Sequence, residues 1–195
     1  MIIPLPCVII AGGKSSRMGS DKALLPFGGF STLTEYQIQR NQSAFQALYV
    51  SCKDRSKFDF DANFIEDVKT FEAYSPLVAL YSIMTKLQTP ICVLSVDTPF
   101  VTSDIYKKMY DVFDHDSDAV IARTGERTQQ LCAIYSCSLL PKIEENLNKN
   151  QHKIQNLFEN SNIKYLDIKD SAPFLNLNRQ EDYQHALALM KESQS

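Results

Sequence analysis

The sequence contains no apolar run that approaches the roughly 20 residues of a membrane-spanning helix. Its start, Met1-Ile2-Ile3-Pro4-Leu5-Pro6, also lacks the basic region with which a signal peptide begins. The five cysteines include no C-x-x-C pair, and most stand in apolar, strand-like contexts, so we expect reduced core residues. These absences predict a soluble cytoplasmic protein without membrane contacts.

The chain also has no excess of positive charge and no internal repeat. Its formal net charge is −3 at pH 7, and charged residues make up 22% of the sequence. A general nucleic-acid-binding domain is basic overall, so this composition argues against a nucleic-acid partner. A chain of 195 residues can bury about 70% of the surface that it exposes when unfolded. We therefore expect a single domain, residues 1–195, that is a monomer or weak oligomer and needs no metal or disulfide to fold.

Short β-rich runs alternate with longer helical patterns along the chain. Several of these runs are apolar throughout, as in strands that are covered on both faces. We expect strands at residues 7–10, 47–51, 63–65, 91–95, 119–122, 131–135 and 163–168. Helical patterns occupy 32–45, which opens with a possible capping box, 76–87, which opens with proline, the segment after Val101, and 139–158. The order predicts an α/β fold in which a mostly parallel, twisted sheet lies between two layers of helices.

A glycine-rich loop follows the first expected strand. The stretch from Ala11 to Lys22 holds three glycines and the cationic side chains of Lys14, Arg17 and Lys22. Glycines let the main chain approach phosphate oxygens, while Arg17 and Lys22 neutralise charge that backbone dipoles alone cannot. Ligands of such sheets bind beyond the carboxyl ends of the strands, where this loop would lie. The loop therefore predicts a triphosphate site.

Two common phosphate-binding motifs do not describe this loop. Gly13-Lys14-Ser15 resembles the end of a Walker A loop, but that motif needs a further glycine where Val8 stands. The dinucleotide pattern G-x-G-x-x-G fails because Gly12 and Gly13 are adjacent. A plain strand-to-helix turn also fits poorly, because it usually spans only about 2–6 residues and needs neither the glycines nor the cations.

Oxygen-bearing side chains stand at two further places. Asp97 follows the buried run 91–95, a position from which a carboxylate could hold a divalent cation beside phosphate oxygens. The alternative is a turn or capping aspartate, which is common before Thr-Pro. Near the C-terminus, Asn176 and Asn178 alternate, so both would project from one face of an extended segment. They could also form a turn before the last helix.

The residues from Ala11 to Leu25 carry a family resemblance. They match every fixed position of the pattern A-G-G-x-S-x-R-M-G-x-D-K-A-L-L, and so resemble the signature of the molybdenum cofactor guanylyltransferase family. The resemblance implies a three-layer, Rossmann-like sheet of the nucleotide-diphospho-sugar transferase type, also called glycosyltransferase A-like. The wider nucleotidyltransferase superfamily shares the glycines, the arginine and the lysine. The loop therefore indicates nucleotidyl transfer more strongly than any one substrate.

Two further blocks resemble metal and phosphate motifs of this family. Asp97-Thr98-Pro99-Phe100 is similar to D-x-P-[FY], whose aspartate binds magnesium. The resemblance thus implies Mg²⁺ as the cofactor and Asp97 as its ligand. Residues 173–178 resemble F-x-N-x-N, which implies that Asn176 or Asn178 completes the magnesium shell or orients the phosphates.

The block at residues 67–80 resembles the family motif D-x(n)-G-P-L-x-G. It makes Asp67 the candidate for base recognition, because a carboxylate can accept from both N1–H and N2–H of guanine; the alternative is a solvated loop aspartate. Ser75 and Ala79 replace the two motif glycines, and Ser75 would be strained if its position demanded a positive φ. Gln129 begins a segment similar to Q-P-L-x-A, with glutamine in place of the proline.

The resemblance implies a reaction and a role for each residue. The chain would transfer GMP from GTP to the phosphate of molybdopterin and release pyrophosphate, with molybdenum cofactor synthesis proteins and apo-molybdoenzymes as further partners. A related cytidylyltransferase acting on molybdopterin or another phosphorylated metabolite, and a catalytically inactive nucleotide-binding adaptor, are the alternatives. The implied residues are Arg17, Lys22 and Asp97 for catalysis; Ala11, Gly12, Gly13, Lys14, Ser15, Lys22, Asp67 and Asp97 for the nucleotide; Asn176, Asn178 and Gln129 for the acceptor or phosphates; and Asp97 for the metal.

Overall fold

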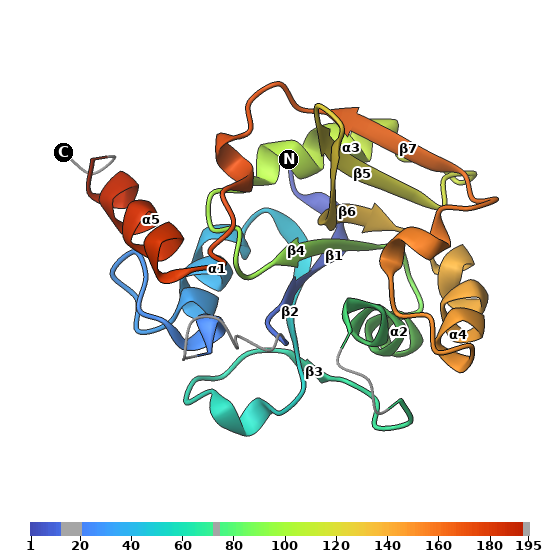
Figure 1. Ribbon diagram of the computed structural model, residues 1–195, viewed down its shortest axis with the longest axis horizontal. Coiled ribbons are helices and arrows are strands. Elements are labelled where there is room, and N and C mark those ends of the chain that lie inside the picture. The colour runs from blue at the N-terminus through green and yellow to red at the C-terminus, as the bar shows by residue number, and fades with distance from the viewer. Residues whose placement is uncertain (13–20, 72–74, 193–195) are drawn as a thin grey trace.

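The computed structural model describes residues 1–12, 21–71 and 75–192 (Figure 1). Its strands are β1 (Ile3–Ile10), β2 (Phe45–Cys52), β3 (Phe64–Glu66), β4 (Ile91–Ser95), β5 (Ala119–Thr124), β6 (Arg127–Tyr135) and β7 (Ile163–Asp167). Its α-helices are α1 (Leu33–Asn41), α2 (Pro76–Leu87), α3 (Ser103–Val112), α4 (Leu140–Asn148) and α5 (Gln180–Glu192). Short 3₁₀ helices are η1 (Lys22–Leu24), η2 (Arg55–Lys57), η3 (Cys137–Leu139), η4 (Ile154–Leu157) and η5 (Ala172–Phe174). Within the described ranges, no helix is both long and apolar enough to cross a membrane.

The strands form one sheet in the order β3-β2-β1-β4-β6-β5-β7. Strands β3, β2, β1 and β4 pair in parallel, as do β5 and β7, whereas β6 pairs antiparallel with both β4 and β5. The prediction of a mostly parallel sheet is thus confirmed, with β6 reversed. The carboxyl ends of β1, β2 and β4 meet at one edge, where ligands of such sheets bind, and the start of β6 lies beside them.

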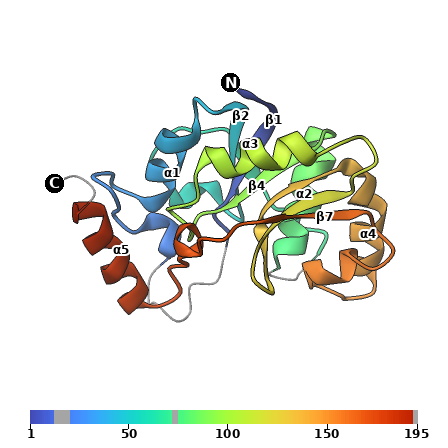
Figure 2. The ribbon, with the colours of Figure 1, turned by 90° about the horizontal axis from the view of Figure 1, so that it is seen from above.

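Helices cover both faces of the sheet, with α2 and α4 together on one face and α1 and α3 on the other, while α5 lies farther from the sheet, beyond α1 (Figures 1 and 2). Alternate residues of β1 divide between the two cores. Cys7 and Ile9 lie in the core shared with α1, α3 and α5, while Val8 and Ile10 lie in the core shared with α2 and α4. Burial on both faces explains why this run is apolar throughout, and the predicted three-layer architecture is confirmed.

Two helices begin where the sequence signals indicated. Thr32 Oγ1 accepts a hydrogen bond from Glu35 N (3.0 Å) at the start of α1. Ser75 caps α2 and is followed by Pro76 in the first turn. The φ angle of Ser75 is −140°, which is ordinary extended backbone, so serine stands here without strain.

Two predicted helix boundaries are wrong. The first helix ends at Asn41 rather than reaching residue 45, because Ala44 N donates to Asn41 O and closes a turn. Phe45 then begins β2 and is buried in the core. The stretch 139–158 contains α4 and the short η4, which are separated at Asn150, whose φ of 57° does not continue a right-handed helix.

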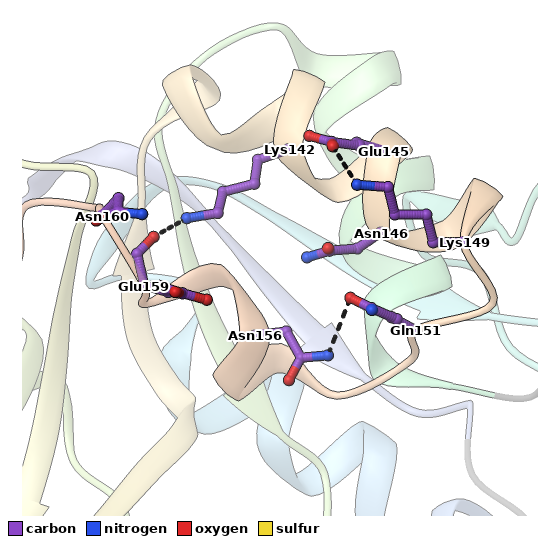
Figure 3. A pocket seen from close by; sticks show the side chains of 8 residues that line it. All are labelled: Lys142, Glu145, Asn146, Lys149, Gln151, Asn156, Glu159 and Asn160. Carbon is purple, nitrogen blue, oxygen red and sulfur yellow. Dashed lines mark hydrogen bonds and ion pairs between the residues drawn. The ribbon is translucent and has the colours of Figure 1, made fainter.

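A polar cavity of about 430 Å³ lies between α4 and η4 (Figure 3). Lys149 pairs with Glu145 (2.5 Å) along α4, and Lys142 donates to the carbonyl oxygen of Glu159 across the cavity. Both lysines therefore have neighbouring oxygens as partners. None of the residues that line this cavity is among the predicted site residues.

Candidate active site

Two adjoining cavities lie at the carboxyl edge of the sheet and share Ser95, Asp97 and Leu131. The Gly12 cavity, of about 190 Å³, lies at the ends of β1 and β4, and the Gln129 cavity, of about 220 Å³, lies at the start of β6. Asp97 is thus placed on the wall between the two. The Gly12 cavity is also lined by Ala11, Gly12, Asp21, Lys22 and Pro76, and the Gln129 cavity by Thr128, Gln129, Gln130, Phe174 and Asn176.

The turn that carries Asp97, and the carboxylate itself, are held by neighbours from three parts of the chain. Ser95 Oγ donates to Asp97 Oδ1 (2.6 Å), and Leu177 N donates to the backbone carbonyl oxygen of Asp97 (2.9 Å). The buried Gln37 amide on α1 donates to the carbonyl oxygen of Thr98 (3.2 Å) and so holds the turn that carries Asp97. The carboxylate is therefore oriented by the protein itself.

Lys22 brings a positive charge to Asp97. Asp21 caps η1 by accepting from Ala23 N (3.0 Å), which fixes the first residue of this helix, Lys22. Lys22 Nζ lies 3.3 Å from Asp97 Oδ2 and donates to Asn178 Oδ1 at 2.9 Å. Only 15% of the Lys22 side chain and 19% of the Asp97 side chain are exposed, so solvent screens this attraction less than at an open surface. The fold thus brings together three of the predicted residues from distant parts of the sequence.

The segment that carries the two asparagines is not simply extended, contrary to the sequence-based expectation. Asn178 bonds to Lys22, while Asn176 lines the Gln129 cavity. Asn178 N donates to Asn176 O (2.9 Å), so a tight turn replaces a simple extended segment, and Leu177 between them is buried. Asn176 is therefore part of the wall of the Gln129 cavity, whereas Asn178 contacts Lys22, which lines the Gly12 cavity.

Gln129 reaches this edge of the sheet because β6 is reversed. The register between β5 and β6 shifts, since Ile121 pairs with Ala133 but Ala122 pairs with Gln129. Residues 130–132 therefore bulge out of the β5 ladder and line the Gln129 cavity. Tyr135 Oη donates to the carbonyl oxygen of Gln130 (2.8 Å) from the core and holds this bulge in place.

Asp67 directly follows β3, beside the end of β2. Asp67 N donates to Cys52 O (2.9 Å), and a Cβ on Gly12 would lie 3.6 Å from Cys52 Cα, so the loop start approaches the same place. Burial raises the pKa of the Asp67 carboxyl to about 6; the charge of Lys53 opposes the rise, and the nearby Ser51 hydroxyl opposes it less. Among the described residues, Ser51 Oγ and Asp67 Oδ1 are buried without a hydrogen-bond partner of normal geometry. Such atoms can still form hydrogen bonds with polar atoms of a ligand.

The remaining nucleotide-binding candidates fall into two groups. Ala11 and Gly12 line the Gly12 cavity. The predicted residues Gly13, Lys14, Ser15 and Arg17 lie outside the described ranges.

Sequence reasoning did not identify Ser95, Gln37 and Tyr135, which orient the site. The one available signal was Ser95 itself, a serine that ends an otherwise apolar run just before Asp97.

The oxygen donors of the site suit a hard divalent cation. Among residues 1–12, 21–71 and 75–192, no group of three or more His, Cys, Asp or Glu side chains is placed to hold a metal ion. Among the described residues, Asp97 lines the Gln129 cavity together with Asn176, and Lys22 Nζ lies between the Asp97 carboxylate and the Asn178 amide oxygen. Mg²⁺ is commonly bound by one or two carboxylates together with substrate phosphates rather than by a complete protein cage. The residues present therefore fit such an ion when a phosphate ligand accompanies it.

Comparison with known proteins relates this geometry to a family. The family described as MobA-like NTP transferase domain matches residues 7–165, which include the second half of β1, the residues that line the Gly12 cavity, Asp97 and Gln129. The chain belongs to this family. A molybdenum cofactor guanylyltransferase of Campylobacter jejuni subsp. jejuni serotype O:6 is 39% identical over 181 residues, which cover 92% of this chain and 94% of the relative. The family and this relative make the chain a nucleotidyltransferase.

Solved structures extend the comparison to the fold. A molybdopterin-guanine dinucleotide biosynthesis protein A from Archaeoglobus fulgidus superimposes with a TM-score of 0.84 at 21% identity, over 96% of this chain and 100% of that one. A Mycobacterium tuberculosis protein solved as a complex with manganese superimposes with a TM-score of 0.66 at 16% identity, over 96% of this chain and 100% of that one. The MobA-like fold is thus shared along almost the whole chain.

Proposed function

We propose that this chain transfers GMP from GTP to the phosphate of molybdopterin, forming molybdopterin guanine dinucleotide and pyrophosphate. Membership of the MobA-like family and the name of the C. jejuni relative support this proposal. One geometric observation carries it. Lys22 Nζ and Asp97 Oδ2 lie 3.3 Å apart on the wall of a cavity that Gly12 of the signature loop also lines.

In the proposed reaction an oxygen of the acceptor phosphate forms a bond to the α-phosphorus of GTP. The bond from this phosphorus to the α–β bridging oxygen breaks, and pyrophosphate leaves. The Gly12 cavity would hold the nucleotide phosphates and the Gln129 cavity the acceptor, so that the two reactants meet at Asp97. Lys22 would stabilise negative charge as it develops, while Gln129 and Asn176 would orient the acceptor phosphate.

The Asp97 carboxylate, with the amide oxygen of Asn176 or Asn178, would hold the divalent cation. When bound, Mg²⁺ would neutralise phosphate charge and orient the triphosphate. Among the described residues, the lining of the two cavities includes no histidine. A general base is not required, because a phosphate monoester has a second pKa near 6 and is already mostly dianionic at neutral pH. The chemistry then depends on position and charge alone.

Asp67 is the proposed acceptor for guanine N1–H and N2–H. Its oxygen Oδ1 and the Ser51 hydroxyl are buried at the end of β2 that Gly12 approaches, beside the Gly12 cavity rather than in its wall, so a base bound in that cavity would have to extend past Gly12 to meet them. The ionised carboxyl accepts both hydrogen bonds, whereas the protonated carboxyl must donate one of its own. GTP affinity should therefore depend on the ionisation of Asp67.

The pKa of about 6 for Asp67 predicts a pH dependence of GTP binding. At pH 5 about a tenth of the carboxyl is ionised, so the Kd for GTP should be about tenfold higher than at pH 7.5. In Asp67→Asn the Kd at pH 7.5 should already be about tenfold higher, and the part of the pH dependence that comes from this residue should vanish. Titration calorimetry of both proteins at pH 5.0, 6.0 and 7.5 measures this, and the variant corrects for titration of GTP itself.

The same pKa also predicts an effect on stability that needs no ligand. A folded pKa of about 6, above that of an unfolded aspartate, means that the free energy of unfolding falls as pH rises from about 4 to about 6. Asp67→Asn should remove this fall, as measured by urea unfolding across that range. Equal pH profiles for both proteins would show that Asp67 is not the titrating group.

Parallel measurement of pyrophosphate release with GTP, CTP and UTP, each with molybdopterin and Mg²⁺, tests the proposed function. We expect release with GTP and formation of the guanine dinucleotide. A preference for CTP would instead identify a cytidylyltransferase. Binding of GTP without any release would identify a nucleotide-binding adaptor and contradict the proposal.

A further inference from the structure

Lys57 joins the two ends of the signature loop. Lys57 Nζ donates to the carbonyl oxygen of Ala11 (3.0 Å) and to Asp21 Oδ2 (2.6 Å). Ala11 is the first residue of this loop, residues 11–22, and Asp21 is its last but one, so one ammonium group contacts residues near both of its ends. Ala11 and Asp21 line the Gly12 cavity, whereas Lys57 does not. Lys57 therefore contacts the wall of the cavity from outside.

The position of Lys57 is well fixed. It ends η2, where Asp54 caps the helix by accepting from Ser56 N (2.8 Å) and Arg55 N donates to Glu66 Oε1 (2.9 Å). The next residue, Phe58, is buried and stacks on another ring of the core, and Lys57 Nζ lies 4.9 Å from the Phe58 ring centre. Only 22% of the Lys57 side chain is exposed. Such anchoring suits a side chain that positions another segment.

A chain of contacts connects Lys57 with the charged centre of the site. Asp21 uses one carboxylate oxygen to accept from Lys57 and the other to cap η1 at Ala23 N. Lys22, the first residue of η1, then contacts Asp97 and Asn178. Loss of Lys57 would leave Asp21 free to rotate and would release the cap that fixes Lys22.

We propose that Lys57 is a positioning residue for nucleotidyl transfer, holding both ends of the signature loop and, through Asp21, the catalytic Lys22. This inference rests on the proposed function. Lys57 lines neither of the two cavities, so its contribution is to the placement of Lys22. Partners that orient a catalytic group in this way typically contribute about 10- to 100-fold to activity.

Steady-state kinetics of Lys57→Met, Lys57→Arg and the control Lys107→Met test this inference. Lys107 pairs with Asp104 (2.8 Å) on α3, away from both cavities, so its loss should change nothing. Lys57→Met should lower kcat/KM for GTP about 10- to 100-fold without raising the KM for molybdopterin. Lys57→Arg should keep most of the wild-type kcat/KM, because the guanidinium group can also bridge a carbonyl and a carboxylate. In an Asp21→Asn background Lys57→Met should lower kcat/KM for GTP much less, since the ion pair between Lys57 and Asp21 is already broken.

Hydrogen exchange without nucleotide provides a readout that does not depend on activity. Lys57→Met should accelerate exchange at the Ala23 amide, which Asp21 holds, while amides of the sheet core keep their wild-type rates. If Lys57→Met accelerates exchange at Ala23 but the wild type releases no pyrophosphate from GTP, Lys57 still positions Asp21 and Lys22, and the proposed function is rejected. Unchanged exchange at Ala23, or a loss of activity that Lys57→Arg does not restore, would overturn the positioning role.

Discussion

Replacing Lys22 with alanine is expected to lower kcat/KM for GTP by about 10²–10³-fold, which corresponds to about 2.7–4 kcal/mol of transition-state stabilisation. The Lys22 ammonium is held beside Asp97 at the point where the two cavities meet. Charge on the nucleotide phosphates increases at this place as the bond to pyrophosphate breaks. An oriented cation that is already in position stabilises that charge without further reorganisation.

The stability of Lys22→Ala should remain close to that of the wild type. Asp97 loses an ionic partner but keeps the Ser95 hydroxyl, and both side chains of the pair are partly exposed, so the free energy of unfolding should fall by roughly 1 kcal/mol. Urea unfolding measures this change beside the assay. Lys107→Ala removes an equal charge outside the site and should leave both quantities unchanged. Wild-type turnover by Lys22→Ala would refute the role proposed for this lysine.

Replacing Asp97 with asparagine should have the largest effect, a loss of about 10³-fold or more in turnover. The substitution keeps the size of the side chain and removes the one carboxylate shared by both cavities. A neutral amide binds a hard divalent cation much less well than a carboxylate, and the cation is expected to supply several kcal/mol of charge stabilisation. The variant should therefore lose both turnover and metal affinity.

Electron paramagnetic resonance of Mn²⁺ in the presence of GTP tests this result apart from turnover. The wild type should bind Mn²⁺ with GTP, and Asp97→Asn should bind it at least tenfold more weakly. Asp104→Asn, which removes an exposed carboxylate on α3, is the matched control and should behave as the wild type. Equal Mn²⁺ affinity in Asp97→Asn would exclude Asp97 as the ligand.

The sequence predicted the central strands β1 and β4 well because they are buried on both faces. The apolar run that contains Val8 and Ile9 is typical of such a strand, and the cap at Thr32 and the proline at 76 marked helix starts that the structure contains. Element boundaries that are set by tertiary contacts could not be predicted from the local sequence. The first helix ends early because Phe45 is buried in the core as a strand residue, which local periodicity does not encode.

The sequence predicted those site residues whose chemistry the function requires. It did not predict the residues that only hold them in place, because their contacts depend on the fold. Lys22 and Asp97 stand in motifs whose chemistry identifies them, and the structure brings them to one cavity. Lys57 and Tyr135 stand in no motif, since each acts on a backbone carbonyl that only the folded chain brings near. The register shift in β6 likewise depends on strand pairing, which spacing alone does not give.

The central claim is that Lys22 and Asp97 converge on one nucleoside triphosphate and its divalent cation. An anomalous difference map from crystals grown with Mn²⁺ and a non-hydrolysable GTP analogue tests it most directly. We expect a single manganese peak at Asp97, with the triphosphate in the Gly12 cavity beside Lys22. A nucleotide bound away from this cavity, or manganese bound with GTP at a place that Asp97 does not reach, would contradict the account.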